Sequence, residues 1–208
     1  MEWLIKGWLL GFTIAAPVGP IGLLCIRKTL TSGMKAGLMS GLGAATADAL
    51  YGMAAGLGLS ALTAFLLDYQ MLLQTAGGLF LCYLGIKPFW RSSAPEWKGQ
   101  EPSPEKGLLY SYLTTWLLTL SNPLTILAFL GVFSASGVLK EQAGSSIPFL
   151  VGGVFLGSLS WWVCLTGATA IFRLRLAAVP SRLKLVNQVS GLVILCFGML
   201  ALVQALFF

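Results

Sequence analysis

The sequence predicts an all-α membrane protein with six transmembrane helices, arranged as two inverted three-helix repeats. Of its 208 residues, 57% are hydrophobic and only 10% are charged, whereas soluble domains carry about 25% charged residues. The mean hydropathy of +0.85 leaves more apolar surface than a chain of this size can bury in a core. Six apolar segments are each long enough to cross a bilayer, and short motifs recur between the two halves.

The six predicted spans are separated by turn and charge signals, and they are Leu4–Ile26, Ala36–Ser60, Met71–Trp90, Leu108–Phe133, Ile147–Ile171 and Val186–Phe207. Strands of a membrane barrel are about 9–11 residues long and alternate in polarity, so these lengths predict helices. The main hydrophilic linker, 92–107, is rich in Pro, Ser, Glu and Lys. We therefore expect one integral membrane domain over 1–208, with three-helix units at 1–91 and 108–208.

The net charge of +6 reflects topology and does not require a nucleic-acid partner. All of the 13 basic residues except Lys6 and Lys140 fall near the first loop (Arg27–Lys35), the third loop or the fifth loop. The positive-inside rule then places these three loops, including the 92–107 linker, in the cytoplasm. Both termini are predicted to lie outside it. The start Met-Glu-Trp carries an acid and does not resemble a signal peptide.

A weak repeat relates the two halves of the chain. The third and sixth spans share an amide, a glycine, a leucine and a second glycine at an offset of 113 residues, in Gln74, Gly78, Leu79 and Gly85 against Asn187, Gly191, Leu192 and Gly198. Pro20 matches Pro123 at an offset of 103. Three spans is an odd number, so the second unit would enter the membrane in the opposite sense. Such inverted repeats are typical of alternating-access carriers.

Asp48 is the acid at the centre of the second span. A charged side chain there costs about 2.5–3.5 kcal/mol on insertion scales. Small residues such as Gly41, Ala44 and Ala45 share its helical face, whereas Leu50 and Met53 lie opposite. We therefore expect Asp48 to point into the bundle, either as a proton-coupling or cation-contact site or as a structural hydrogen-bond acceptor.

Two predicted helix breaks lie deep in the membrane. Pro17, Gly19 and Pro20 interrupt the first span, and Ser121, Asn122 and Pro123 interrupt the fourth. Proline removes a backbone donor, and irregular backbone at this depth is tolerated where it meets protein or a watery cavity. These six residues are the candidate substrate-binding positions, although a packing kink is the alternative for each break.

Other chemistry finds little support in the sequence. The chain has no histidine, and its four cysteines show no C-x-x-C spacing. We expect no metal, no cofactor and no enzymatic activity. A metal or inorganic-ion transporter and an intramembrane enzyme are kept as alternatives, although one membrane aspartate suits neither. Glycine stripes pack helices within and between chains alike, so a homo-oligomer stays open.

The stretch GFTIAAPVGPIG at 11–22, followed by a basic loop and GLGAATADALYG at 41–52, resembles the LysE-type (lysine-exporter) family of amino-acid exporters. The resemblance covers the whole chain, and Gly19, Pro20, Asp48, Asn122 and Pro123 occupy the family's motif positions.

The resemblance implies a secondary-active exporter that moves amino acids or related small metabolites out across the bacterial inner membrane and is driven by protons. Its partners would be an amino-acid substrate, protons and the lipid bilayer. One position departs from the family pattern, because Leu124 follows Asn122-Pro123 where members often carry Lys. A mechanism that needs a cation at that position is therefore not expected here.

Overall fold

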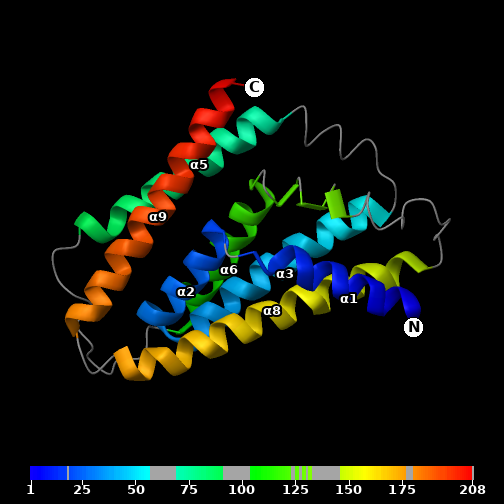
Figure 1. The fold of residues 1–208 in the computed structure, drawn as a ribbon, viewed down its shortest axis with the longest axis horizontal. Helices are drawn as coiled ribbons and strands as arrows, with labels where there is room; N and C mark the ends of the chain where they lie inside the picture. Colours follow the sequence, from blue (N-terminus) through cyan, green and yellow to red (C-terminus); the bar gives the residue numbers. More distant parts are fainter. Residues whose placement is uncertain are drawn as a thin grey trace.

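The computed structural model is helical throughout the part of the chain that it describes, and no strand occurs there (Figure 1). The described residues are 1–17, 19–56, 69–90, 104–122, 125–126, 128–129, 131–132, 146–176 and 180–207. Their helices are α1 (Glu2–Ala15), α2 (Pro20–Ser32), α3 (Met34–Gly56), α5 (Gln70–Trp90), α6 (Pro104–Leu120), α8 (Ile147–Leu176) and α9 (Pro180–Phe207).

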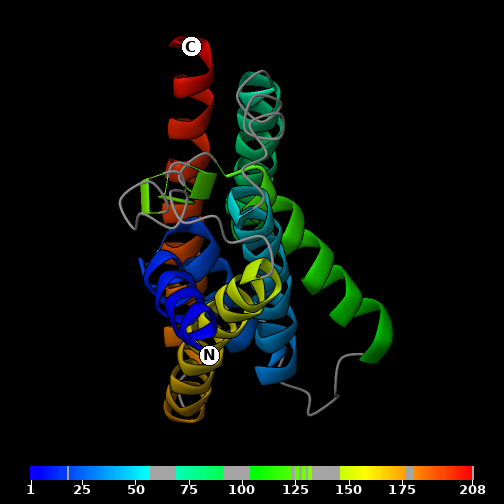
Figure 2. The same ribbon diagram turned by 90° about the vertical axis from the view of Figure 1, so that its right-hand side faces the viewer.

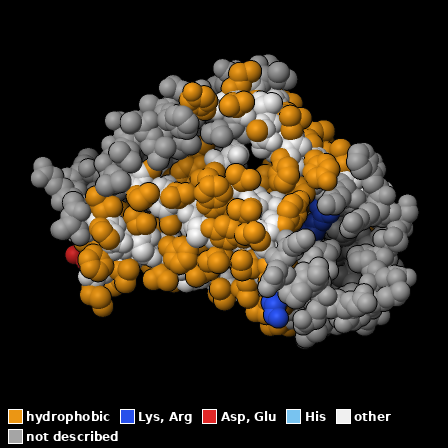
Figure 3. Space-filling view, turned by 180° about the vertical axis from the view of Figure 1, so that it is seen from behind, with side chains coloured by type: hydrophobic (Ala, Val, Ile, Leu, Met, Phe, Trp, Pro, Cys, Tyr) orange, Lys and Arg blue, Asp and Glu red, His pale blue; other side chains and the backbone are white. Residues whose placement is uncertain are grey.

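Two described helices are long and apolar enough to cross a membrane, through Ile147–Phe172 in α8 and Gln188–Ala205 in α9. The bent pair α1 and α2 makes a third candidate. Hydrophobic side chains cover most of the described surface on the face shown in Figure 3. The described part of the chain is therefore all-helical and has the character of a membrane protein, while the count of six spans and the inverted repeat stay predictions.

The first span is broken where its two prolines predict. α1 ends at Ala15 and α2 begins at Pro20, and the two helices are bent by 81°. Gly19 caps α2 in an extended conformation and donates its N–H to the Pro17 carbonyl at 2.9 Å. Proline suits the first position of a helix because the N–H that it lacks would have no helical partner there.

The predicted first loop, Arg27–Lys35, is wrong in its extent. α2 continues to Ser32 and α3 begins at Met34, so the connection is the single residue Gly33. Gly33 has a φ of 96°, which favours glycine because it has no Cβ. The basic residues belong to helix ends that extend past the apolar segment, since Lys and Arg are good helix formers.

The linker predicted at 92–107 lies outside the described residues up to residue 103. α6 begins at Pro104, inside that range, and proline again suits the first turn of a helix.

α1 and α8 lie side by side and run in the same direction (Figure 1). Gly7 packs on the Leu150 carbonyl, and Gly11 packs on the Val154 carbonyl one turn further along both helices. Without side chains at these positions the two backbones approach closely, as in small-residue packing of membrane helices. Gly153 and Gly157 form a glycine stripe on α8 with a spacing of four residues, and both contact α1.

α3 lies between α8 and α6 and packs against both. It runs antiparallel to α8, because Gly37 faces Thr166 while Gly52 faces Val154. It runs parallel to α6, since Ser40 and Tyr51 contact progressively later α6 residues.

α5 and α9 form an antiparallel pair that stands beside the other helices (Figures 1 and 2). A Cβ atom on Gly85 would come within 2.8 Å of the Gly191 carbonyl oxygen, and one on Gly78 within 3.1 Å of the Gly198 carbonyl oxygen. The glycines that define the sequence repeat thus meet one another at this crossing.

Candidate functional site

Asp48 lies on α3 and is only 3% exposed. Ala44, Ala45 and Ala47 around it are fully buried, whereas Leu50 and Met53 on the opposite side are 37% and 40% exposed. The predicted orientation is confirmed, because the small-residue face of the helix packs inward and the Leu/Met face does not.

The carboxylate of Asp48 contacts α8. Ser158 Oγ donates a hydrogen bond of 2.6 Å to Asp48 Oδ2, and Trp162 Nε1 donates one of 3.0 Å to Ser158 Oγ. All three side chains are buried. Among the described side chains the salt bridge found is Lys6–Glu2 at 2.9 Å, so the acid is held by a hydroxyl and not by a cation.

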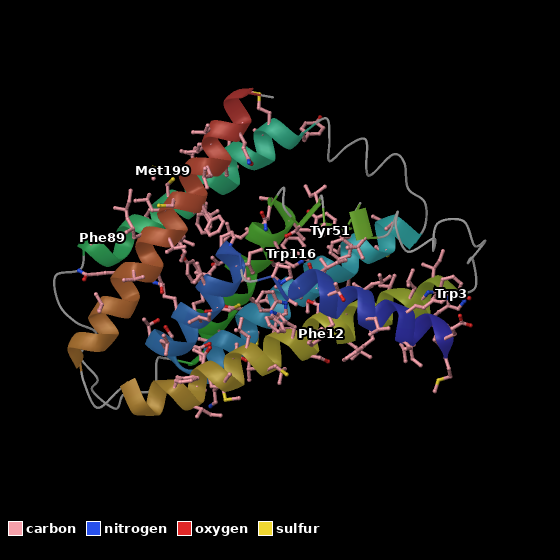
Figure 4. The ribbon with its side chains drawn as sticks, viewed as in Figure 1. Trp3, Phe12, Tyr51, Phe89, Trp116 and Met199 are labelled. Atoms are coloured by element: carbon pink, nitrogen blue, oxygen red, sulfur yellow. The ribbon has the colours of Figure 1, made fainter. Side chains whose placement is uncertain are left out.

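Tyr51 lies one turn after Asp48 on α3 and contacts both sides of the break in the fourth predicted span. Its hydroxyl donates a hydrogen bond of 2.7 Å to the carbonyl of Leu120, the last residue of α6. Beyond the break, its ring packs against Phe129 with centroids 5.3 Å apart. Figure 4 shows Tyr51 in the middle of the helix block, far from Phe89 on α5 and Met199 on α9.

The break itself is visible around Ser121 and Asn122. The Asn122 N–H donates to the Thr119 carbonyl, and the Asn122 carbonyl then accepts hydrogen bonds from the N–H groups of Thr125 and Ile126. The Asn122 side chain also donates from Nδ2 to Thr125 Oγ1 at 2.9 Å. Asn122 therefore ends one helical segment and starts the next, while Pro123 lies outside the described residues.

The break in the first span has a different environment at each of its residues. Pro17 is exposed and Pro20 is buried. A Cβ atom built on Gly19 would meet no atom within 4 Å, so open space adjoins the backbone at the start of α2. The backbone of Gly19 has a φ of −98°, which any residue can adopt.

Both breaks flank the part of α3 that carries Asp48. Ala15 and Ile21, on either side of the first break, share a buried cluster with Ala44 and Ala45 of α3. Tyr51 of α3 contacts the second break. Residues that adjoin the two breaks are thus held against α3 within two turns of Asp48.

Sequence reasoning missed Ser158, Trp162 and Tyr51 as partners of this region. Tyr51 shares the face of Asp48, which is a usable signal for it. Ser158 directly follows Gly157 in the glycine stripe, but nothing in its sequence context distinguishes it from the many other helical hydroxyls. Its role depends on which helix packs against α3, which only the fold reveals.

Helices interrupted next to a buried acid are the arrangement of a membrane transporter, and the comparisons agree with this class. The family model described as LysE type translocator matches residues 12–205. The chain therefore belongs to the LysE type translocator family, whose members are transporters.

Three relatives illustrate the match. "Putative amino acid efflux protein YcgF" of Bacillus subtilis (strain 168) is 31% identical over 91% of this chain and 90% of its own length. "Uncharacterized membrane protein YahN" of Escherichia coli (strain K12) is 28% identical over 84% of this chain and 77% of its own. "Uncharacterized membrane protein YrhP" of Bacillus subtilis (strain 168) is 24% identical over 85% and 87%. No solved structure matches.

Proposed function

We propose that this protein is a secondary-active exporter that moves amino acids or related small metabolites out across the bacterial inner membrane. The observation that carries the proposal is the position of Asp48, a buried acid next to two interrupted helices in a LysE type translocator. The printed name of the relative YcgF refers to amino acid efflux, which favours amino acids as the substrate class.

The substrate would bind next to the two breaks. The start of α2, behind Pro17, Gly19 and Pro20, has backbone N–H groups without helical acceptors, and these suit a carboxylate. Backbone carbonyls around Ser121–Pro123, or Asp48 itself, would receive the ammonium group. The open space at Gly19 supports this placement on the side of the first break.

Alternating access in this proposal is a movement of one three-helix unit, 1–91, against the other, 108–208. The crossing of α5 and α9 supports the repeat. Under the offset of 113 residues, Gly78 corresponds to Gly191 and Gly85 to Gly198. The contact of Gly78 with Gly198 therefore corresponds to the contact of Gly191 with Gly85, and both contacts occur. A two-fold relation between the units would have this consequence.

The helix directions favour the predicted topology. α1 and α8 belong to the first and fifth spans, which should cross the membrane in the same sense, and they run parallel. α3 and α6, in the second and fourth spans, are parallel to each other, and α3 is antiparallel to α8. Six alternating spans are consistent with these pairings, and the side on which the termini lie stays a prediction.

Coupling to protons rests on Asp48. A buried carboxylate within a membrane segment is expensive to keep charged, so uptake and release of a proton there is a physically reasonable driving step.

The described residues contain no group of three His, Cys, Asp or Glu side chains that could hold a metal ion. No specific observation favours the metal-transporter alternative over amino-acid export.

The test is efflux from proteoliposomes loaded with a panel of labelled amino acids, measured with and without an imposed pH gradient. Gradient-dependent release of one class of amino acid would establish the function and name the substrate. Release that ignores the gradient would contradict proton coupling. If no amino acid moves while the protein is folded, amino-acid export is wrong and an ion or another solute takes its place.

A further inference from the structure

Ser158 uses its hydroxyl differently from most helical hydroxyls in the described part of the chain. Thr29, Thr115, Thr119 and Thr166 each donate to the carbonyl four residues earlier on their own helix. Ser158 instead donates across the helix contact to Asp48. A hydroxyl that does not donate to the carbonyl four residues earlier needs another contact to fix its orientation.

Trp162 supplies that orientation. An indole N–H can only donate, so Ser158 Oγ must be the acceptor in the bond of 3.0 Å from Trp162 Nε1. The single proton of Ser158 is then directed to Asp48 Oδ2, at 2.6 Å. While Asp48 is ionised, the order of these hydrogen bonds, from indole to hydroxyl to carboxylate, is fixed by the chemistry of the three side chains.

The chain lies where α3 meets α8, and this contact is otherwise made by small and apolar groups. Gly41 faces Trp162 and Gly52 faces Val154 on either side of it. α3 belongs to the 1–91 unit and α8 to the 108–208 unit. Among the described residues, the side-chain hydrogen bond that joins these two helices is the one from Ser158 to Asp48.

We infer that Ser158 and Trp162 are positioning residues that make the contact between α3 and α8 depend on whether Asp48 carries a proton. A hydrogen bond to an ionised carboxylate is about twice as strong as one between neutral groups. The contact between α3 and α8 is then stronger when Asp48 is ionised, and protonation of Asp48 weakens it. This inference rests on the proposed function, because it assigns a coupling step to that exporter.

Other titratable groups lie on α3 itself and on the helices packed against it. Tyr51 is on α3 itself and bonds to Leu120. From α2, Cys25 shares the cluster of Trp162, and Lys28 donates to the Ser111 carbonyl at 3.1 Å. From α6, Tyr112 bonds to Thr46. Each of these groups has its own contact, and the described partner of the carboxylate is Ser158.

The experiment compares Ser158→Ala and Trp162→Phe with the wild type in proteoliposomes, using the substrate that the panel identifies. Two quantities are measured, gradient-driven efflux and substrate exchange without a gradient. We expect Ser158→Ala to keep exchange and to lose about ten-fold in the ratio of the two, the factor for one charge-assisted hydrogen bond. Efflux as a function of pH should become flatter. Trp162→Phe should change the same ratio in the same direction.

The chain offers a matched control in a second Trp–Ser pair. Trp8 Nε1 donates to Ser160 Oγ at 3.2 Å, but Ser160 donates to the Leu156 carbonyl and not to an acid. Ser160→Ala and Trp8→Phe should leave the ratio unchanged. In Asp48→Asn protein, adding Ser158→Ala should have no further effect on the ratio.

Several results would overturn the inference. One is a wild-type ratio and a wild-type pH profile in Ser158→Ala when Asp48→Asn has lost its gradient-driven efflux. That result would contradict the role of Ser158 but not the proposed export function. Another is an equal loss in the Ser160→Ala control. If exchange falls in parallel with gradient-driven efflux, Ser158 is a structural residue and the inference is wrong.

Discussion

The Tyr51 hydroxyl donates a hydrogen bond of 2.7 Å to the Leu120 carbonyl, at the residue where α6 ends. One turn away on the same helix, Asp48 accepts from Ser158 of α8. Two neighbouring side chains of α3 therefore make contacts with other elements. Asp48 contacts α8, and Tyr51 contacts the second helix break. This arrangement makes α3 the helix on which the account can be tested most directly.

Removing the Tyr51 hydroxyl should lower the transport rate and change the stability of the fold only slightly. Tyr51→Phe loses one neutral hydrogen bond, worth about 1 kcal/mol, and keeps the ring that packs on Phe129. Tyr112→Phe is the matched control, since the Tyr112 hydroxyl bonds to Thr46 at 2.9 Å and also joins α6 to α3. Thermal unfolding in detergent should be similar for both variants, and only Tyr51→Phe should lower the efflux rate. Equal efflux rates would remove the second break from the proposed site.

A side chain at the α5–α9 crossing should destabilise the protein. In Gly85→Val the new Cβ would lie 2.7 Å from the Leu195 backbone nitrogen, so the helices must separate. Overpacking of this kind costs about 1–3 kcal/mol, which should appear as a lower unfolding temperature. Gly167→Val on α8 is the control, because a Cβ there meets no atom within 4 Å. An unchanged unfolding temperature in Gly85→Val would mean that the crossing is looser than described.

The open space at Gly19 should accept a side chain without harm to the fold. Gly19→Ala and Gly19→Leu both have an allowed backbone conformation and no close neighbour, so their unfolding temperatures should match the wild type. If the space is part of the substrate path, Gly19→Leu should reduce efflux strongly while Gly19→Ala does so weakly. Wild-type efflux in Gly19→Leu would place the path elsewhere.

The predicted topology can be tested with tags. Tags at the N- and C-termini should be digested by protease added to intact spheroplasts, because both ends are predicted to lie outside the cytoplasm. A tag inserted after Gln100, in the linker 92–107, should be digested only after the cells are opened. Protection of one terminus together with digestion of the other would require an odd number of spans.

The sequence predicted the inward orientation of Asp48 and the break at Pro17–Pro20, because both depend on local chemistry. Small residues around Asp48 allow close packing of that face, and the prolines interrupt the helix at their own positions. The extent of the first loop was wrong because charge marks the limit of the apolar segment, while the helices continue past it to Ser32 and resume at Met34.

The partners of the candidate site could not be read from the sequence. In the sequence Ser158 resembles the other helical hydroxyls, and its contact with Asp48 is seen only when α8 is placed against α3. The packing role of Gly7 and Gly11 is likewise seen only when the parallel contact with α8 is known. Helix pairing between distant segments is a property of the whole fold. The glycine motif of the third and sixth spans was recognised in the sequence as a repeat, but the contact of its members where α5 crosses α9 is seen only in the fold.

The most direct test of the central claim is the transport behaviour of Asp48→Asn, which keeps the size of the side chain and its ability to accept from Ser158. If the backbone carbonyls at the second break bind the ammonium group, the variant should fold and exchange substrate across the membrane, because these binding positions are unchanged. It should show no efflux driven by a pH gradient, because the amide that replaces the carboxyl group cannot take up and release a proton. Gradient-driven efflux at the wild-type rate would contradict the role of Asp48 in coupling, and loss of the folded protein would make Asp48 a structural hydrogen-bond acceptor.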